Sequence, residues 1–290
     1  MRALAAVNGS PKSLNAFRSV CRIAKALGYY VTAFYVDTAD EFTTEETRWP
    51  FIKIRIEKEQ RQLQHDVIRD AVAEGRALGV EVEGVVSRGA PAVEIINYVA
   101  ANGIVRLVAM GYSSGEPFST SVTRAVAAGL ARPLLAVSSE FEVKKIFVLI
   151  EDVRTAGAVA AFAGLLAKSI GGGAAAVHIL ACVPDAAETA AQYARISEVP
   201  DMTTRASVRE MERLYARRLD ALITVSSLAI GRLGITAAVE TFRGDPAAAI
   251  AASPPFDLLV VAGRSGFKEP LTPLAESLLK TPAFNVVLVQ

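Results

Sequence analysis

Small polar residues follow two apolar, strand-like runs in the first half of the chain. Residues 2–7 lead into Asn8-Gly9-Ser10, and residues 105–110 lead into Gly111. Turns of this kind, placed where a strand ends and a helix begins, present backbone N–H groups and a positive helix end to anions such as phosphate. The candidate binding residues in this half are Asn8, Gly9, Ser10, Val36, Gly111, Gly115 and Ser121.

The second half repeats this arrangement with acidic residues. Residues 145–150 lead into Glu151 and Asp152, and a later apolar run ends in Gly263. Two adjacent carboxylates repel a triphosphate unless a divalent cation lies between them, so we expect Mg²⁺ only where a nucleotide binds. The candidate binding residues in this half are Glu151, Asp152, Gly263, Gly266 and Thr272.

Catalytic chemistry lacks a matching set of side chains. Serines such as Ser10 have no histidine placed to activate them, and the sequence contains no Walker lysine motif. His65 is predicted on a helix surface and His178 in a buried strand, without the spacing of metal ligands. We therefore expect no catalytic and no metal-binding residues.

An internal repeat determines the predicted architecture. Residues 87–111 and 242–263 both carry Arg-Gly-x-Pro-Ala, a short apolar helix pattern and a buried-strand run that ends in glycine. Strand, glycine turn, helix and strand are typical of βαβ units in a parallel sheet. The repeat predicts two tandem Rossmann-like α/β domains, residues 1–138 and 143–290, each a five-stranded parallel sheet with helices on both faces. Arg88 and Arg243 can contact a ligand phosphate or a neighbouring carboxylate.

Local signals place the remaining elements. Ser10 and Pro11 predict a helix start, long helical patterns cover about 53–78 and 204–228, and residues 185–201 read as a polar loop. The last apolar run of each half, 133–138 and 285–289, predicts an open sheet edge. We expect these two edges to pair within one chain, and a homodimer remains an alternative.

Composition limits the partners. The 31 basic and 30 acidic residues nearly cancel, so nothing favours nucleic acid or an acidic membrane. No apolar run reaches the roughly 18 residues of a membrane span, and no signal peptide is recognisable, so we expect a cytoplasmic protein. Cys21 and Cys182 lie in apolar elements and predict packing in a reducing compartment; a disulfide between them is the less favoured alternative.

The order of these motifs resembles the universal stress protein family, tandem two-domain type. The resemblance rests on strand-Asn8-Gly9-Ser10-helix, on Gly-x-Pro before a helix, and on a strand ending in glycine before a final helix and strand, twice. It implies an adenine nucleotide alpha hydrolase-like fold, a stress-related role and ATP as ligand. Nucleotide-binding members carry Asp after the first strand and a G-x2-G-x9-G-[ST] loop after the fourth.

Both halves depart from that pattern. Asn8 and Glu151 replace the aspartate, and the glycine loops are shorter, running from Gly111 to Ser121 and from Gly263 to Thr272. Shorter loops offer fewer N–H donors, so the loops are interpreted as degraded, with tighter binding in the second half, which keeps Gly266. The leading hypothesis is a non-catalytic binding or regulatory stress protein. The alternatives are slow ATP hydrolysis at the second cleft and a purely structural dimerisation module.

Overall fold

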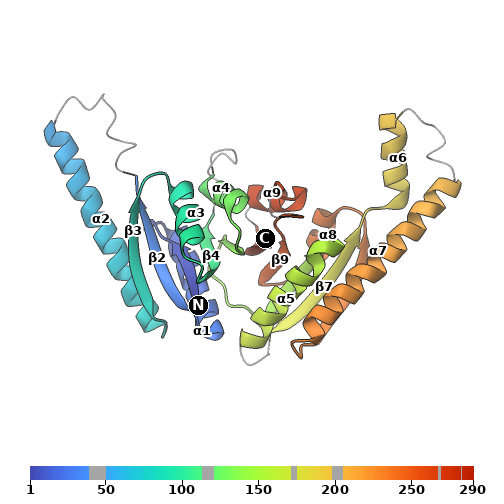
Figure 1. Cartoon of the computed structure of the whole chain (residues 1–290), viewed down its shortest axis with the longest axis horizontal. Helices are drawn as coiled ribbons and strands as arrows, with labels where there is room; N and C mark the ends of the chain where they lie inside the picture. Colours follow the sequence, from blue (N-terminus) through green and yellow to red (C-terminus); the bar gives the residue numbers. More distant parts are fainter. Residues whose placement is uncertain (39–49, 113–120, 171–174, 198–204, 267–268, 282) are drawn as a thin grey trace. The chain divides into compact units, whose positions relative to one another are not determined.

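The computed structural model describes residues 1–38, 50–112, 121–170, 175–197, 205–266, 269–281 and 283–290. Strands and helices alternate along the chain (Figure 1). By its internal contacts the chain divides into two compact units, Met1–Glu142 with Gly266–Gln290, and Val143–Ser265. Both units are α/β, as the repeat predicted.

The first unit is built on a parallel sheet in the order β3-β2-β1-β4-β5. Its strands are β1 (Arg2–Ala6), β2 (Tyr30–Asp37), β3 (Val82–Arg88), β4 (Val105–Gly111) and β5 (Leu134–Val137). The chain winds in one direction from β1 to β3 and then returns to the other side of β1, so the strand order reverses between β1 and β4. Open parallel sheets bind ligands at such a switch point.

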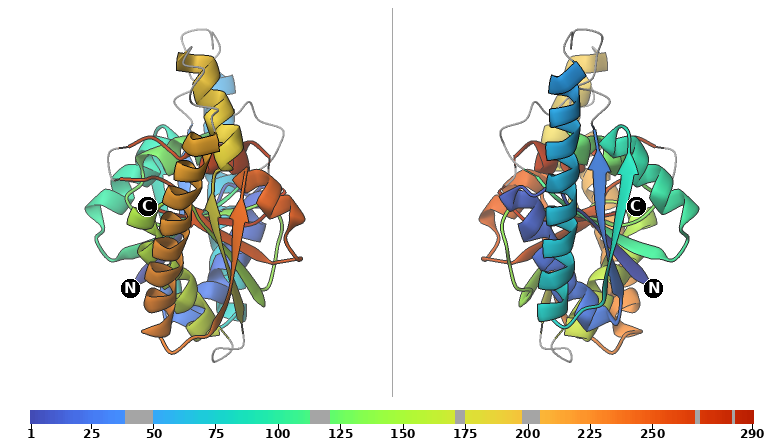
Figure 2. Two further views of the ribbon diagram at one scale, coloured as in Figure 1. Left: turned by 90° about the vertical axis from the view of Figure 1, so that its right-hand side faces the viewer. Right: turned by 90° about the vertical axis from the view of Figure 1, so that its left-hand side faces the viewer.

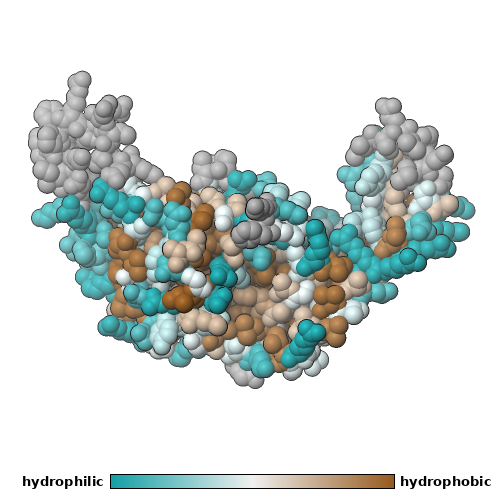
Figure 3. Space-filling view, viewed as in Figure 1, coloured by the Kyte–Doolittle hydropathy of each residue, from teal (hydrophilic) through white to brown (hydrophobic). Residues whose placement is uncertain are grey.

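Helices cover both faces of this sheet (Figure 2). One layer contains α1 (Pro11–Leu27) and α2 (Pro50–Ala77), and the other contains α3 (Pro91–Ala101) and α4 (Val122–Gly129). Helix α2 buries Val67 and Ala71 against the sheet, while its outer surface is hydrophilic (Figure 3, left). This one-sided burial is the amphipathic pattern of a surface helix.

Turn chemistry explains where the helices begin. Ser10 accepts a hydrogen bond from the backbone N–H of Ser13 (3.2 Å) with Pro11 in the first turn, and Gly28 ends α1 at φ 66°. In the repeated Arg-Gly-x-Pro motif, Gly89 and Gly244 have φ of 139° and 132°. Only glycine adopts such angles without strain, so the motif is a strand-to-helix turn in both halves.

The C-terminal segment belongs to the first unit. It contributes α9 (Pro273–Lys280) and β10 (Val286–Val289). Strand β10 pairs antiparallel with β5, with Val287 opposite Leu135. The predicted pairing of the two final apolar strands is therefore confirmed, and the first unit carries the sixth strand on its sheet.

The second unit has parallel strands in the order β9-β6-β7-β8. These are β9 (Leu258–Ala262), β6 (Lys145–Ile150), β7 (Ala176–Val183) and β8 (Ala237–Arg243). Helices α5 (Val153–Ser169) and α7 (Arg205–Gly231) pack on each other and on this sheet, and α8 (Pro246–Ala252) connects β8 to β9.

The predicted polar loop at residues 185–201 was wrong in its larger part, because α6 (Ala186–Ser197) lies there. Asp185 accepts a hydrogen bond from the Glu188 N–H at 2.9 Å, and its carbonyl accepts one from the Thr189 hydroxyl at 2.7 Å. The segment is rich in alanine, the strongest helix former. The alanine content and the Asp185 cap were the local signals of this helix.

The structure contains no disulfide between the two cysteines and, among the described helices, no membrane-spanning one. Cys21 and Cys182 are free and buried, so the alternative of a disulfide between them was wrong. Burial raises the pKa of both thiols to about 12. Across the described ranges, none of the helices combines the length and hydropathy needed to cross a bilayer.

Candidate functional site

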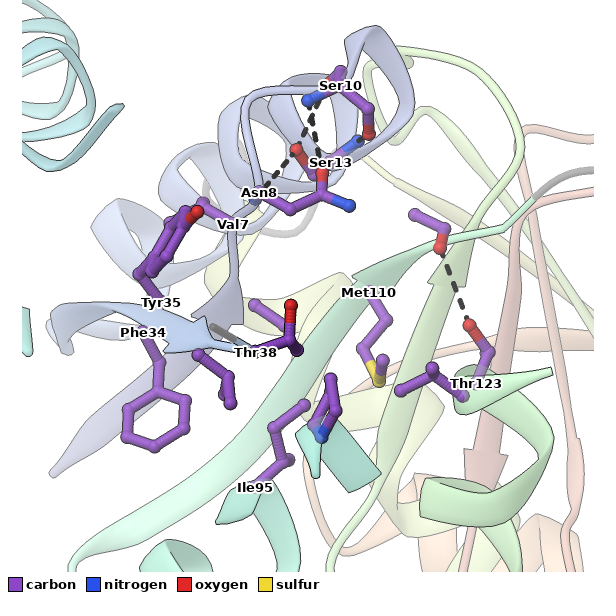
Figure 4. A pocket seen from close by; sticks show the side chains of 15 residues that line it. Val7, Asn8, Ser10, Ser13, Phe34, Tyr35, Thr38, Ile95, Met110 and Thr123 are labelled. Atoms are coloured by element: carbon purple, nitrogen blue, oxygen red, sulfur yellow. Dashed lines mark hydrogen bonds between the residues drawn. The ribbon is translucent and has the colours of Figure 1, made fainter. Parts of the chain in front are cut away.

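A cavity of 260 Å³ opens in the first unit where the strand order reverses. It lies at the carboxyl ends of β1, β2 and β4 and beside the starts of α1, α3 and α4 (Figure 4). Its lining residues are Ala6, Val7, Asn8, Ser10, Ser13, Phe34, Tyr35, Val36, Thr38, Pro91, Ile95, Met110, Gly111, Val122 and Thr123.

None of the fifteen described residues of the cavity wall carries a charged side chain. The wall combines apolar side chains with the amide of Asn8 and with hydroxyl groups such as those of Ser10 and Ser13. Figure 4 shows Asn8, Ser10 and Ser13 grouped at the start of α1, with Met110 and Ile95 on the other side. Apolar side chains beside neutral polar groups suit a small neutral ring that also forms hydrogen bonds.

The start of α1 uses its own hydrogen-bond donors. The Asn8 side-chain oxygen accepts from the Ser10 N–H at 3.0 Å, and the Asn8 N–H donates to the Ser13 hydroxyl at 3.3 Å. The Ser13 N–H donates to the Ser10 hydroxyl at 3.2 Å, and Pro11 has no N–H. Asn8 and Ser10 thus stabilise the turn and cap the helix. This capping role explains both residues without the expected phosphate contact.

Gly111 brings β4 against the first turn of α1. A Cβ at this position would lie 2.3 Å from the carbonyl oxygen of Lys12 and 2.8 Å from the nitrogen of Ser13. The Thr123 hydroxyl donates to the Gly111 carbonyl at 3.4 Å, which ties the start of α4 to the same strand end. The glycine is therefore required by backbone packing, and this packing shapes the cavity.

The other predicted residues of the first half have mixed positions. Val36 lines the cavity. Gly9 has φ 81° and a Cβ there would meet Val67 at 2.9 Å, so close packing also explains this glycine. Ser121 is the N-cap residue of α4 without a side-chain capping bond. Gly115 lies outside the described residues.

In the second unit, two arginine side chains form hydrogen bonds with the acidic residues that follow β6, one with the Asp152 carboxylate and one with the Glu151 backbone carbonyl. Asp152 caps α5 by accepting from the Arg154 N–H at 3.0 Å, and the Arg154 Nη2 lies 2.7 Å from its Oδ2. These hydrogen bonds hold the Asp152 pKa below its usual value. Arg218 donates to the Glu151 carbonyl at 2.6 Å. Burial raises the pKa of Glu151, although Arg218 opposes the shift.

Positive charge near these carboxylates was not foreseen. The sequence argument placed a divalent cation between the carboxylates when a nucleotide binds, whereas the structure places the side chains of Arg154 and Arg218 near them. An arginine two residues after an N-cap aspartate is a local signal that sequence reading can find. No local signal connects Arg218, far along α7, with Glu151.

The remaining second-half candidates are divided between the units. Gly263 is buried after β9 in the second unit, whereas Gly266 and Thr272 belong to the first. Thr272 caps α9 by accepting from the Ala275 N–H at 3.1 Å. The short glycine loop therefore leads from one compact unit into the other.

The two histidines lie on different elements, His65 on α2 and His178 on β7. His65 is exposed, as predicted. The His178 side chain is 23% exposed, not buried in a core: its ring meets Phe147 edge-on at 5.3 Å, and Nε2 lies 3.4 Å from Glu240 Oε2. Among the residues that the structure describes, no three His, Cys, Asp or Glu side chains form a group that could hold a metal.

Sequence reasoning missed most of the cavity wall. Phe34, Ile95, Met110 and Thr123 were assigned only to elements. Their positions at strand ends and helix starts carried a weak signal, because the wall depends on which elements lie next to one another. Phe34 is further supported by Tyr98, whose ring centroid lies 4.7 Å away.

Comparisons with known proteins connect this fold to a family. The family model described as "Universal stress protein family" matches residues 1–138, and no curated protein matches the chain. A universal stress protein from Archaeoglobus fulgidus DSM 4304 is similar with a TM-score of 0.68 and 19% identity, over 100% of this chain and 98% of that one. A functionally unknown protein from Pseudomonas aeruginosa PAO1 is similar with a TM-score of 0.60 and 14% identity, over 99% and 92%.

At these identities the two structures support the fold alone. The family assignment rests on the matched residues 1–138 and agrees with the Rossmann-like arrangement of the first unit. Residues 1–138 belong to the universal stress protein family, and the length of the chain, about twice that of one such domain, fits the tandem type.

Proposed function

We propose that this chain is a non-catalytic stress-response protein that binds an adenine nucleotide, with the nucleoside part in the cavity of the first unit. The observation that carries the proposal is a cavity of 260 Å³ at the switch point of the sheet, whose described lining has neutral polar and apolar side chains and no charged one. The family resemblance suggests the ligand class, an adenine nucleotide. The cavity suggests which part of that ligand is bound, the nucleoside.

The polarity of the wall favours the ring over the phosphates. Burying phosphate charge requires cations or several free N–H donors. The described wall has no charged residue, and the N–H groups of Ser10 and Ser13 already donate to Asn8 and Ser10 side chains. Adenosine should therefore bind almost as tightly as ATP, and Mg²⁺ should change the affinity of this cavity little.

A binding role also agrees with the chemistry of the described wall. A general base or nucleophile with a suitable pKa is the minimum for hydrolysis. The wall offers hydroxyls and one amide, such as Ser13 and Asn8, without a histidine or carboxylate beside them. Bound nucleotide would then act as a regulatory ligand that is released unchanged.

Slow ATP hydrolysis at the second-unit carboxylates remains the second candidate. The raised pKa of the half-buried Glu151 favours it, because raising the pKa of a carboxylate makes it a stronger base toward an attacking water. Asp152 is engaged with Arg154, which leaves Glu151 as the base and gives Mg²⁺ a role only at this site. Phosphate release from ATP that disappears in Glu151→Gln would support this candidate.

Calorimetric titration tests the cavity. Adenosine, AMP and ATP are titrated into the full chain with Mg²⁺ or with chelator. Val36→Trp places a large ring into the cavity and should weaken adenosine binding at least tenfold. The matched control is Val93→Trp on α3, where the original side chain is 52% exposed. Equal affinity in the two variants would contradict binding in this cavity.

The same titration separates the two halves. The sequence predicts tighter binding in the second half, whereas the cavity favours the first. If Glu151→Gln alters affinity and Val36→Trp does not, the ligand binds in the second unit. The proposed tandem division at residues 1–138 and 143–290, the cytoplasmic location and a homodimer remain predictions, and sedimentation at several concentrations tests the last.

A further inference from the structure

We propose that the C-terminal segment, residues 269–281 and 283–290, controls the first-unit cavity, so that seating of this segment and ligand binding are energetically coupled. The inference rests on the proposed function for the identity of the ligand, but its structural part does not. The segment comes from the second half of the sequence and lies in the first unit. It would therefore let the second repeat regulate the binding site of the first.

The segment is seated by both backbone and side chain. Strand β10 pairs with β5 through residues 286–288. Asn285, 7% exposed, accepts from the N–H groups of Ser138 at 3.0 Å and Ser139 at 3.3 Å. A buried amide that serves two backbone donors defines one register, because a shifted strand would leave these groups unpaired.

A first bridge leads from this seat to β4. Tyr112 follows the cavity residue Gly111 and is 5% exposed. Its hydroxyl donates to the carbonyl of Phe284 at 2.6 Å. Burial raises the pKa of this phenol, so it remains a neutral donor at physiological pH. The position of the β4 end is thus joined to the chain just before β10.

A second bridge leads to α4, which packs against α9. The Arg124 Nη2 lies 3.2 Å from Glu276 Oε1, and Arg124 follows the cavity residue Thr123. One turn later, Gln290 donates to the carbonyl of Ala127 at 3.1 Å. Helix α4 is therefore held by the C-terminal segment at two points, Arg124 and Ala127.

A third bridge reaches the start of α1. The Lys12 ammonium donates to the carbonyl of Ser138 at 2.5 Å, and Lys12 lies between the cavity residues Ser10 and Ser13. The N–H of the same Ser138 donates to Asn285. Three parts of the cavity wall, at the end of β4 and at the starts of α4 and α1, are thus each next in sequence to a residue that contacts the segment or Ser138: these residues are Tyr112, Arg124 and Lys12.

Coupling of this kind is reciprocal. If a seated segment strengthens ligand binding by some factor, bound ligand must stabilise the seat by the same factor. The loss of one net hydrogen bond predicts an effect of roughly three- to tenfold. A residue that merely supports the fold would not transmit ligand binding to β10. The effect of bound ligand on the hydrogen exchange of β10 is therefore the discriminating measurement.

Hydrogen exchange of the full chain tests the proposal without ligand first. Tyr112→Phe should accelerate exchange of residues 121–127, whereas the matched control Tyr215→Phe, which removes a hydroxyl bond to Thr189 in the second unit, should not. Glu276→Arg should act like Tyr112→Phe, and adding Arg124→Glu should restore slow exchange by reversing the ion pair. Unchanged exchange in both single variants would overturn the proposal.

The second arm uses adenosine as the probe. Saturating adenosine should slow exchange of residues 286–289, and Tyr112→Phe should weaken adenosine binding about fivefold. Bound adenosine without any effect on β10 would overturn the coupling. If wild-type protein takes up no adenine probe, the proposed ligand is wrong, and the ligand-free arm still decides whether the segment controls the cavity wall.

Discussion

Replacing Gly111 by alanine should destabilise the first unit strongly, although it adds only one methyl group. The new Cβ would lie 2.3 Å from the Lys12 oxygen, 2.4 Å from the Lys12 carbonyl carbon and 2.8 Å from the Ser13 nitrogen. All three are backbone atoms, so no side chain can rotate away. Moving the oxygen to the 3.4 Å at which ordinary contact begins requires a separation of about 1.1 Å.

The energetic cost follows from what this movement disrupts. Overpacking a core costs about 1–3 kcal/mol, and Gly111→Ala should lie at the upper end, about 3 kcal/mol, because β4 and α1 are both held by the sheet and the cap. The Ser10 and Ser13 bonds would lengthen as α1 moves. The cavity would change shape with them, so ligand affinity should fall together with stability.

Urea unfolding followed by far-ultraviolet circular dichroism measures this cost. The matched control is Gly103→Ala in the same unit, where nothing lies within 4 Å of the new Cβ, and it should change the free energy of unfolding by less than about 0.5 kcal/mol. If Gly111→Ala were as stable as Gly103→Ala, the close approach of β4 and α1 would not exist in solution.

Other predictions concern buried and paired groups. Because burial raises the pKa of Cys21 and Cys182 to about 12, a thiol reagent at pH 8 should label neither in the folded protein and both in urea; rapid labelling without urea would refute their burial. Asp152 has a lowered pKa through Arg154, so its contribution is present above the ordinary carboxyl pKa and lost as pH falls; Asp152→Ala should cost about 1 kcal/mol at pH 7 and much less at pH 3. Glu151 has a raised pKa, so the wild type loses stability as the pH rises from the ordinary carboxyl pKa to the raised pKa of the folded protein. Glu151→Gln should therefore raise the melting temperature at pH 8 and leave it unchanged at pH 3, and a lower melting temperature at pH 8 would contradict the burial argument.

Much of the fold was predictable because its signals are local. The Arg-Gly-x-Pro repeat predicted two strand-to-helix turns, and both glycines have the positive φ that such a turn needs. Ser10, Pro11 and Gly28 marked the limits of α1 through capping. Even the pairing of the last strands followed from an edge too apolar to remain open.

The candidate site was predictable only as a place. Strand ends pointed to Asn8, Ser10 and Gly111, and all three line the cavity. Their roles were not predictable, because the same residue types cap a helix start with their side chains or leave its N–H groups free to bind a phosphate. Coordinates separate the two, since they show that the donors of Ser10 and Ser13 are already used.

By itself the sequence determined the alternation of strands and helices and the family of residues 1–138. Only the tertiary structure decided that α9 and β10 belong to the first unit, that Arg218 donates to the Glu151 carbonyl, and that no described residue of the cavity wall carries a charged side chain. The physical reason is the range of the interactions. Caps, turns and periodicity act within a few residues, whereas a cavity wall and a hydrogen bond such as that from Arg218 to the Glu151 carbonyl depend on packing between segments far apart in the chain.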